Sequence, residues 1–176
     1  MENSKITEAE LHEWIQKLDL PPIILEIYNE KISDPVFREE LGYDYSKPYS
    51  ILDLSPNEQE HYELDRYKPI LEIRGSTILA FDTHRNGFIL YSLEENIEEP
   101  NCFTWDGAFL DEVSFWFENE MSEEDIFHLG NLLNLKYTEE IIESLSEAEE
   151  NDELSTFEEN DEWMEKVIKE LKLRID

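Results

Sequence analysis

The sequence predicts an α+β fold in which a central, mostly antiparallel sheet is flanked by N-terminal helices and covered by several C-terminal helices. Three apolar runs between about residues 68 and 93 are separated by two turn signals, Arg74-Gly75-Ser76 and Asn86-Gly87, and this spacing is typical of a strand meander. Apolar residues recur at helical spacing on both sides of this region. Because the three runs are nearly continuous rather than alternating, we expect the sheet to be covered on both faces.

Helix-start signals precede the meander. Thr7-Glu8-Ala9-Glu10 is a capping box for a first helix. A second helix is predicted over residues 23–31, and Pro35 suits the first position of a short helix that ends at Leu41. Residues 42–65 are predicted to be an irregular connection with one short strand or turn.

The region after the meander is predicted to be helical. Helices are expected over residues 109–117, after Ser122, from Thr138 and after Ser155, with residues 147–153 as a linker or a frayed helix end. This region is also where the acidic residues concentrate. Residues 94–165 carry 25 acids and one base, a net charge of −24, whereas residues 1–93 carry 18 acids and nine bases, a net charge of −9. The recurring apolar residues argue against a disordered acidic tail.

The overall charge restricts the classes of partner. The 176 residues include 45 acidic and 14 basic side chains, a net charge of −31 at pH 7. This charge disfavours direct contact with nucleic acid or an anionic membrane and favours a basic partner. No apolar run approaches the ~20 residues that span a bilayer. We expect a single domain over residues 1–176 and, because no secretory signal is visible and Cys102 is the single cysteine, a cytoplasmic location.

The sequence contains no arrangement of residues that points to catalysis, and we expect a protein that is not an enzyme. The histidines His12, His61, His84 and His128 are scattered without ligand spacing, and no Gly-rich phosphate loop is present. Cys102 lacks a basic neighbour and is expected to be a buried or half-buried structural thiol. We therefore expect no catalytic residues, no metal and no cofactor.

Two further patterns in the sequence have simpler interpretations than a functional site. Asp82, Asn86 and Gly87 match the first, fifth and sixth positions of a calcium loop, but His84 and Leu93 occupy positions that should hold ligands. A hairpin turn at Asn86-Gly87 is therefore favoured. Carboxylate pairs of the glycosidase type are also possible, but with 45 acids close pairs arise by chance and a solvated acidic surface is favoured.

The acidic segment directly after the meander is the predicted functional surface. Its acids would steer the encounter with a basic protein and cover a cationic groove on it, while an aromatic side chain holds the complex. Most of the aromatic residues between Phe103 and Phe117 are expected in the core, with Trp105 or Trp116 as a possible exposed anchor. Contact through the C-terminal helices and a role in solubility alone are the alternatives. The predicted partner-binding residues are Glu94, Glu95, Glu98, Glu99, Trp105, Asp106, Asp111 and Glu112.

Short motifs along residues 20–120 occur in an order that resembles a known family. The stretch Gly75-Ser76-Thr77-Ile78-Leu79-Ala80-Phe81-Asp82 is a Gly turn followed by an apolar strand that ends in Asp, and Gly87-Phe88-Ile89-Leu90-Tyr91 is the next strand. Leu20-Pro21 with Tyr28 precedes them, and Ser114-Phe115-Trp116-Phe117 follows. This order resembles the SUKH superfamily of Smi–Knr-like and Syd-like proteins. The usual Asn-Gly-Gly after the Tyr-containing helix is replaced here by Asn29-Glu30-Lys31.

The resemblance implies a SUKH-like core over residues 20–120, with residues 121–176 as an acidic helical C-terminal extension. It also implies an immunity protein, an antitoxin that binds and neutralises a cognate polymorphic toxin, often a nuclease, and it offers no catalytic residues. A nuclease needs a basic groove for its substrate, which an acidic protein can shield. The alternative is a regulatory or scaffold interaction module of the same fold, without catalysis.

Overall fold

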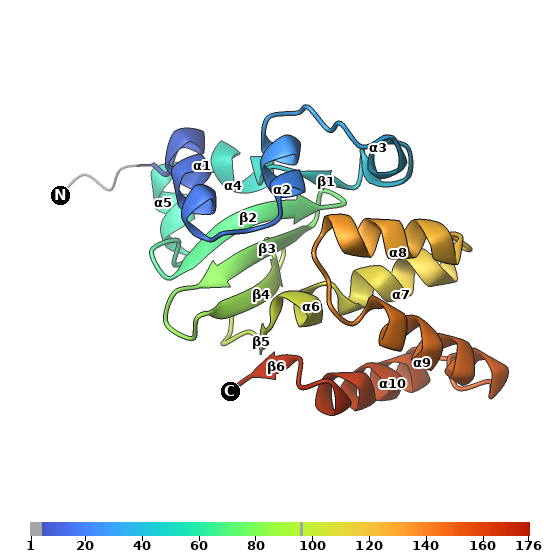
Figure 1. Cartoon of the computed structure of the whole chain (residues 1–176). Helices are drawn as coiled ribbons and strands as arrows, with labels where there is room; N and C mark the ends of the chain where they lie inside the picture. The colour runs from blue at the N-terminus through green and yellow to red at the C-terminus, as the bar shows by residue number, and fades with distance from the viewer. Residues whose placement is uncertain (1–4, 96) are drawn as a thin grey trace. The chain divides into compact units, whose positions relative to one another are not determined.

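The computed structural model describes residues 5–95 and 97–176. The expectation that the N-terminus carries no secretory signal rests in part on residues 1–4, which lie outside the described residues. The chain forms two compact units, Met1–Cys102 and Phe103–Asp176. Helices and strands occur in both units (Figure 1). The predicted α+β class is therefore confirmed.

The first unit contains the meander and the helices that precede it. Its elements are α1 (Glu8–Lys17), α2 (Pro22–Tyr28), α3 (Pro35–Leu41), β1 (Tyr45–Ser46), α4 (Tyr49–Asp53), α5 (Pro56–Glu60), β2 (Tyr67–Ile73), β3 (Thr77–Asp82) and β4 (Gly87–Ser92). Strands β1, β2, β3 and β4 are neighbours in that order, and each pair is antiparallel.

Strands β2, β3 and β4 confirm the predicted meander. Leu79 of β3 lies opposite Leu71 on one side and Leu90 on the other. Gly75, in the turn between β2 and β3, has a φ of 66°, a conformation that glycine adopts without steric cost. The register of β2 against β3 shifts between Pro69 and Leu71, directly after Pro69, which has no backbone N–H to donate to the neighbouring strand.

The strands of the meander differ in how completely they are buried. In β2 every residue except Lys68 is buried, as expected for a strand covered on both faces. In β4, by contrast, buried Gly87, Ile89 and Tyr91 alternate with residues that are only half-buried, among them Phe88 and Leu90. One face of β4 is thus only partly covered, which is less than the complete cover that was expected. Its apolar composition did not reveal this, because half-buried sheet positions also favour aromatic and aliphatic residues.

Helix α1 packs beside β2, as Figure 1 shows, and contributes an aromatic contact to the sheet. The ring of Trp14 lies 6.1 Å from that of Phe81, and Phe81 lies 5.4 Å from Phe88 in an edge-on arrangement. The predicted capping box at Thr7 and Glu10 is present at the start of α1. These contacts fix the helix against the half-buried face of the meander.

The connection over residues 42–65 is more regular than predicted. It contains β1, α4 and α5, and α5 begins with a capping box formed by Ser55 and Glu58. In α4, the backbone N–H and the hydroxyl of Ser50 donate hydrogen bonds of 2.9 and 2.6 Å to the carboxylate of Glu72. These bonds satisfy the Glu72 carboxylate, which is buried in β2.

The second unit is mainly helical. Strand β5 (Cys102–Phe103) lies at the boundary of the two units, and the elements that follow are α6 (Trp105–Ala108), α7 (Leu110–Glu118), α8 (Glu123–Leu132), α9 (Thr138–Glu150), α10 (Phe157–Glu170) and β6 (Arg174–Ile175). Helix α9 packs against α7, α8 and α10. Its buried Leu145 belongs to a core that includes Trp116, Leu129 and Trp163.

One expected helix start in this unit is wrong. Thr156 rather than Ser155 caps α10, because Thr156 forms a capping box with Glu159. Helix α9 extends through Glu150, so residues 147–153, predicted as a linker or a frayed helix end, begin as the end of a helix. Ser122 caps α8 as predicted.

The end of the chain packs on α6. The backbone N–H of Thr104 donates a 2.9 Å hydrogen bond to the carbonyl of Leu173. A Cβ atom on Gly107 would lie 2.4 Å from that carbonyl oxygen, so this position excludes any side chain. The C-terminal segment therefore packs against the start of the second unit.

Residues 103–120 belong to the second unit, although the sequence placed them in a core with the meander. Trp105 ties this segment to the second unit, because its indole N–H donates a 2.7 Å hydrogen bond to the carbonyl of Leu133. Asp106 adds to it by accepting hydrogen bonds from the backbone N–H groups of Lys136 and Tyr137. That the whole chain behaves as a single domain stays a prediction.

Phe81→Asp is expected to lower the free energy of unfolding by roughly 3 kcal/mol. The substitution removes the ring that packs against Trp14 and Phe88 and places a carboxylate at this half-buried position. Urea unfolding checks this prediction, with Phe81→Leu as a control that keeps an apolar side chain. Equal stability of the two variants would contradict the packing described here.

Candidate functional site

The candidate site begins at Asp82, a fully buried carboxylate at the end of β3. The Nε–H of Arg85 donates to it at 2.7 Å, and the backbone N–H groups of His84 and Arg85 donate at 2.9 and 3.3 Å. Arg66, just before β2, donates from Nε and Nη2, both at 3.4 Å. Asp82 therefore joins the β3–β4 turn to the start of β2.

These contacts determine how Asp82 ionises. Burial alone would raise the pKa of its carboxyl group, but the hydrogen bonds from Arg85, His84 and Arg66 outweigh burial and lower the pKa to about 2. Asp82 is therefore a carboxylate at neutral pH. Because its oxygens already accept hydrogen bonds from these donors, we assign Asp82 a structural role in stabilising the β3–β4 turn.

The favoured interpretation of this segment as a hairpin is confirmed. Asp82 pairs with Gly87 at the ends of the two strands, and Asn86 takes a φ of 57° while its N–H donates to the carbonyl of Asp82 at 2.8 Å. Among residues 5–95 and 97–176, no group of three or more His, Cys, Asp or Glu side chains could hold a metal ion. Cys102 is buried, as expected.

Arg85 also anchors the acidic segment that follows β4. Its Nη2–H donates a 2.8 Å hydrogen bond to the carbonyl of Pro100. At the other end of the segment the hydroxyl of Tyr62, whose ring stacks on Tyr91, donates to the carbonyl of Leu93 at 3.0 Å. We call residues 93–95 and 97–100 the acidic loop. Both of its ends are thus fixed to the folded part of the first unit.

The four glutamates predicted to bind a partner in this loop all lie on the surface. They are Glu94, Glu95, Glu98 and Glu99, and each is exposed. Their carboxylates form no ion pair within residues 5–95 and 97–176. The acidic loop therefore presents four unneutralised carboxylates from an anchored segment.

The other four predicted residues lie in the second unit and differ in their accessibility. Asp111 is exposed, whereas Glu112 is buried. Asp106 is also buried, and its carboxylate accepts hydrogen bonds of 2.5 and 3.0 Å from the backbone N–H groups of Lys136 and Tyr137. Asp106 and Glu112 are therefore not accessible to a partner in this conformation.

Trp105 was proposed as an exposed aromatic anchor, but the structure gives it an internal role. The side chain is half-buried, its indole N–H donates to the carbonyl of Leu133, and its ring lies 4.8 Å from that of Phe109. No sequence pattern reveals this partner, because Leu133 lies 28 residues further along the chain. Whether Trp105 contacts a partner as well stays a prediction.

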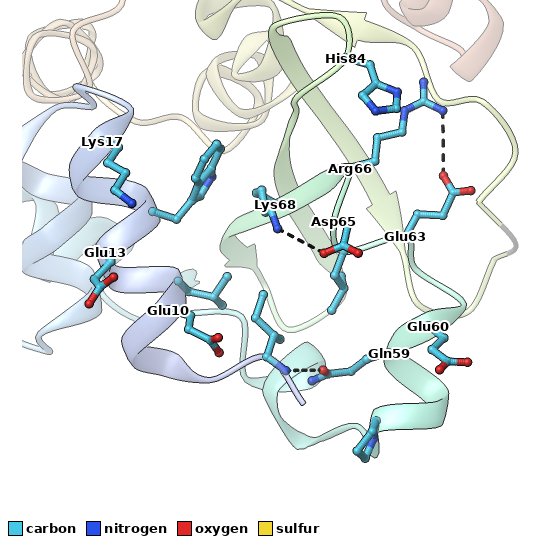
Figure 2. Close-up of a pocket in the computed structure, with 15 residues that line it drawn as sticks. Glu10, Glu13, Lys17, Gln59, Glu60, Glu63, Asp65, Arg66, Lys68 and His84 are labelled. Atoms are coloured by element: carbon cyan, nitrogen blue, oxygen red, sulfur yellow. Dashed lines mark hydrogen bonds and ion pairs between the residues drawn. The ribbon is translucent and has the colours of Figure 1, made fainter. Parts of the chain in front are cut away.

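A groove of about 830 Å³ in the first unit was not predicted. It lies between α1, α5 and the start of β2, and Figure 2 shows its labelled side chains. Basic Lys17, Arg66 and Lys68 alternate there with acidic residues. Nη1 of Arg66 lies 4.0 Å from Oε2 of Glu63, and Nζ of Lys68 lies 3.8 Å from Oδ1 of Asp65. We call it the α1 groove. No sequence motif predicts it, because residues that line it, such as Lys17 and Lys68, are far apart in the sequence.

The chemistry available in the α1 groove is limited to charge and hydrogen bonding. Glu10 points into it, but hydrogen bonds from the hydroxyl and backbone N–H of Thr7 lower the pKa of this carboxyl group. Glu10 thus acts as an ionised helix cap and would be a poor proton donor. His84 lies at the edge, with no serine, threonine or cysteine among the described lining residues.

No protein-family model matches the chain, and no curated protein or solved structure matches it either. Within the described parts of the chain, none of the helices combines the length and apolar character needed to cross a membrane. The resemblance to the SUKH superfamily and the roles that it implies therefore stay predictions.

The hydrogen bonds to Asp82 predict a loss of stability in acid. The pKa of about 2 in the folded protein is below the ~3.9 of an unfolded Asp, so this contribution is fully present above about pH 4 and is lost as the pH falls toward 2. It amounts to roughly 2 kcal/mol. Urea unfolding of the wild type and Asp82→Asn should give stabilities that converge over this range.

A titration of the Asp82 carboxyl carbon by NMR checks the same prediction without a variant. Its midpoint should lie near pH 2. A midpoint near the ~3.9 of an ordinary Asp would contradict the role assigned to Arg85 and Arg66.

Proposed function

We propose that this chain is a non-catalytic protein-binding module whose acidic loop binds a basic surface on a partner protein. The observation that carries the proposal is the geometry of the loop. Hydrogen bonds to Leu93 and Pro100 fix its ends, and its exposed glutamates have no cationic partner among the described residues. A fixed loop loses less conformational entropy on binding than a free one, which favours affinity.

Charge supports a basic partner over other classes. A net charge of −31 repels nucleic acid and anionic lipid surfaces, and it attracts a cationic surface over a distance of about one Debye length, ~8–10 Å at 0.1–0.15 M salt. Electrostatic steering can raise association rate constants to about 10⁸–10⁹ M⁻¹s⁻¹ at low salt. The carboxylates of the acidic loop would supply this steering and then neutralise the partner's cations.

The finer proposal is that the partner is a toxin and the chain is its immunity protein. It is supported by the resemblance of residues 20–120 to the SUKH superfamily and by the match between an acidic loop and the basic substrate groove of a nuclease. In this mechanism the loop covers the groove and excludes substrate, so the chain itself needs no catalytic residue. A partner that is not toxic would instead favour the regulatory or scaffold role.

Reversal of the four loop charges tests the contact. The variant carries Glu94→Lys, Glu95→Lys, Glu98→Lys and Glu99→Lys, and the partner is captured with tagged wild-type chain and then purified. The association rate constant at low salt should fall roughly tenfold or more, with a weaker dependence on salt, because the steering charges are inverted. Surface plasmon resonance at two salt concentrations measures both quantities.

A second variant of equal net charge separates the loop from the overall charge. It replaces four exposed glutamates of α9 with lysine: Glu140, Glu143, Glu147 and Glu150. This control should lose much less affinity than the loop variant. Equal losses would show that only total charge matters, and an unchanged loop variant would remove the loop from the interface.

Co-expression with the partner tests the proposed immunity role, since only an immunity protein restores growth of cells that produce a toxic partner.

A further inference from the structure

A second groove lies in the second unit, where the ends of α7 and α9 meet the start of α10. It has a volume of about 520 Å³. Phe157, the first residue of α10, lies at this groove and is 94% exposed, while Phe117 and Leu154 beside it are half-buried. We call this site the Phe157 groove. Its apolar side chains are grouped rather than scattered singly over the surface, which is the arrangement that marks interaction sites.

Local hydrogen bonds hold the Phe157 groove in shape. The capping box at Thr156 fixes the start of α10, with the N–H of Thr156 donating to Glu159 at 2.9 Å and the N–H of Glu159 donating back to the Thr156 hydroxyl at 3.2 Å. Before it, the N–H of Glu153 donates to the carbonyl of Ala148 at 2.9 Å and ends α9. Phe157 is thus presented to solvent from a defined backbone.

The charged side chains of the groove are all acidic. Its carboxylates belong to Glu118, Glu120, Glu149 and Asp152, each of them exposed. No lysine, arginine or histidine is among the described residues that line it. Apolar side chains surrounded by exposed carboxylates are complementary to a cationic segment that also carries an apolar residue.

We propose that the Phe157 groove binds a basic peptide segment that carries an apolar side chain. The apolar side chain packs on Phe157, Phe117 and Leu154, and lysines or arginines of the segment pair with the surrounding carboxylates. This inference rests on the proposed function, because it assumes a basic partner, and it adds a second contact with its own specificity. The acidic loop steers by charge alone, whereas the Phe157 groove also selects for an apolar residue among the cations.

The probe is a short amidated peptide in which lysines flank a central leucine, compared with the same peptide carrying serine at that position. It is titrated into the isotope-labelled full chain at low salt, and backbone amide shifts are followed by NMR. The shifts should concentrate on residues 117–120 and 149–160, and the serine peptide should bind about tenfold more weakly.

Two aromatic variants isolate the apolar contact. Phe157→Ser should weaken leucine-peptide binding about tenfold and leave the fold intact, because the side chain is 94% exposed. Tyr43→Ser is the matched control, since Tyr43 is 100% exposed and does not line the groove, and it should leave binding unchanged. Equal affinities of the wild type and Phe157→Ser would overturn the proposal.

The remaining outcomes separate this inference from the proposed function. Shifts confined to the acidic loop, or spread over all exposed carboxylates, would overturn the groove and leave the proposed function standing. Peptide that binds nowhere would overturn the groove as well, and the charge-reversal titration with the captured partner judges the loop independently. Phe157-dependent self-association in light scattering would assign the groove to contact with a second copy of this chain and overturn the proposal.

Discussion

The architecture of the first unit depends on one buried carboxylate. Asp82 holds Arg85 at 2.7 Å, and Arg85 in turn holds the carbonyl of Pro100 at 2.8 Å, so a single charge network connects the β3–β4 turn to the acidic loop. Arg66 links the same carboxylate to the start of β2. A buried carboxylate without donors would be costly, and these hydrogen bonds offset that cost while they fix the geometry. The position of one end of the loop therefore depends on the hydrogen bonds to Asp82, while Tyr62 fixes the other end.

The chain tolerates its extreme charge by separating buried acids from exposed ones. Glu72 and Asp106 are buried like Asp82, and each accepts hydrogen bonds from specific groups, Ser50 for Glu72 and backbone N–H groups for Asp106. These acids have structural roles. The glutamates of the acidic loop and the carboxylates of the Phe157 groove lie in water, where an ordinary solvated surface and a binding surface look alike from composition. Two features distinguish these places from an ordinary solvated surface: the loop is anchored at its ends, and the carboxylates of the groove lie beside apolar side chains.

Sequence patterns predicted the parts of the fold that depend on local chemistry. The meander followed from its apolar runs and the Asn86-Gly87 turn, and the first helix from the capping box at Thr7. Helix α5 was missed although Ser55 and Glu58 form a capping box, because a helix this short leaves no apolar periodicity. Long-range contacts could not be predicted, because the hydrogen bond from Trp105 to Leu133 and the presence of Lys17 and Lys68 at one groove depend on tertiary packing. The exposure of the four loop glutamates could be predicted, but their anchoring through Arg85 could not.

The most direct test of the account is hydrogen–deuterium exchange of the full chain, free and in complex with its captured partner. If the anchored acidic loop is the contact, amide exchange in residues 93–95 and 97–100 slows in the complex, because binding shields a segment that is exposed in the free chain. The β3–β4 hairpin, whose backbone groups are already hydrogen-bonded in the sheet, should change little. Slowed exchange elsewhere with an unchanged acidic loop would contradict the central claim.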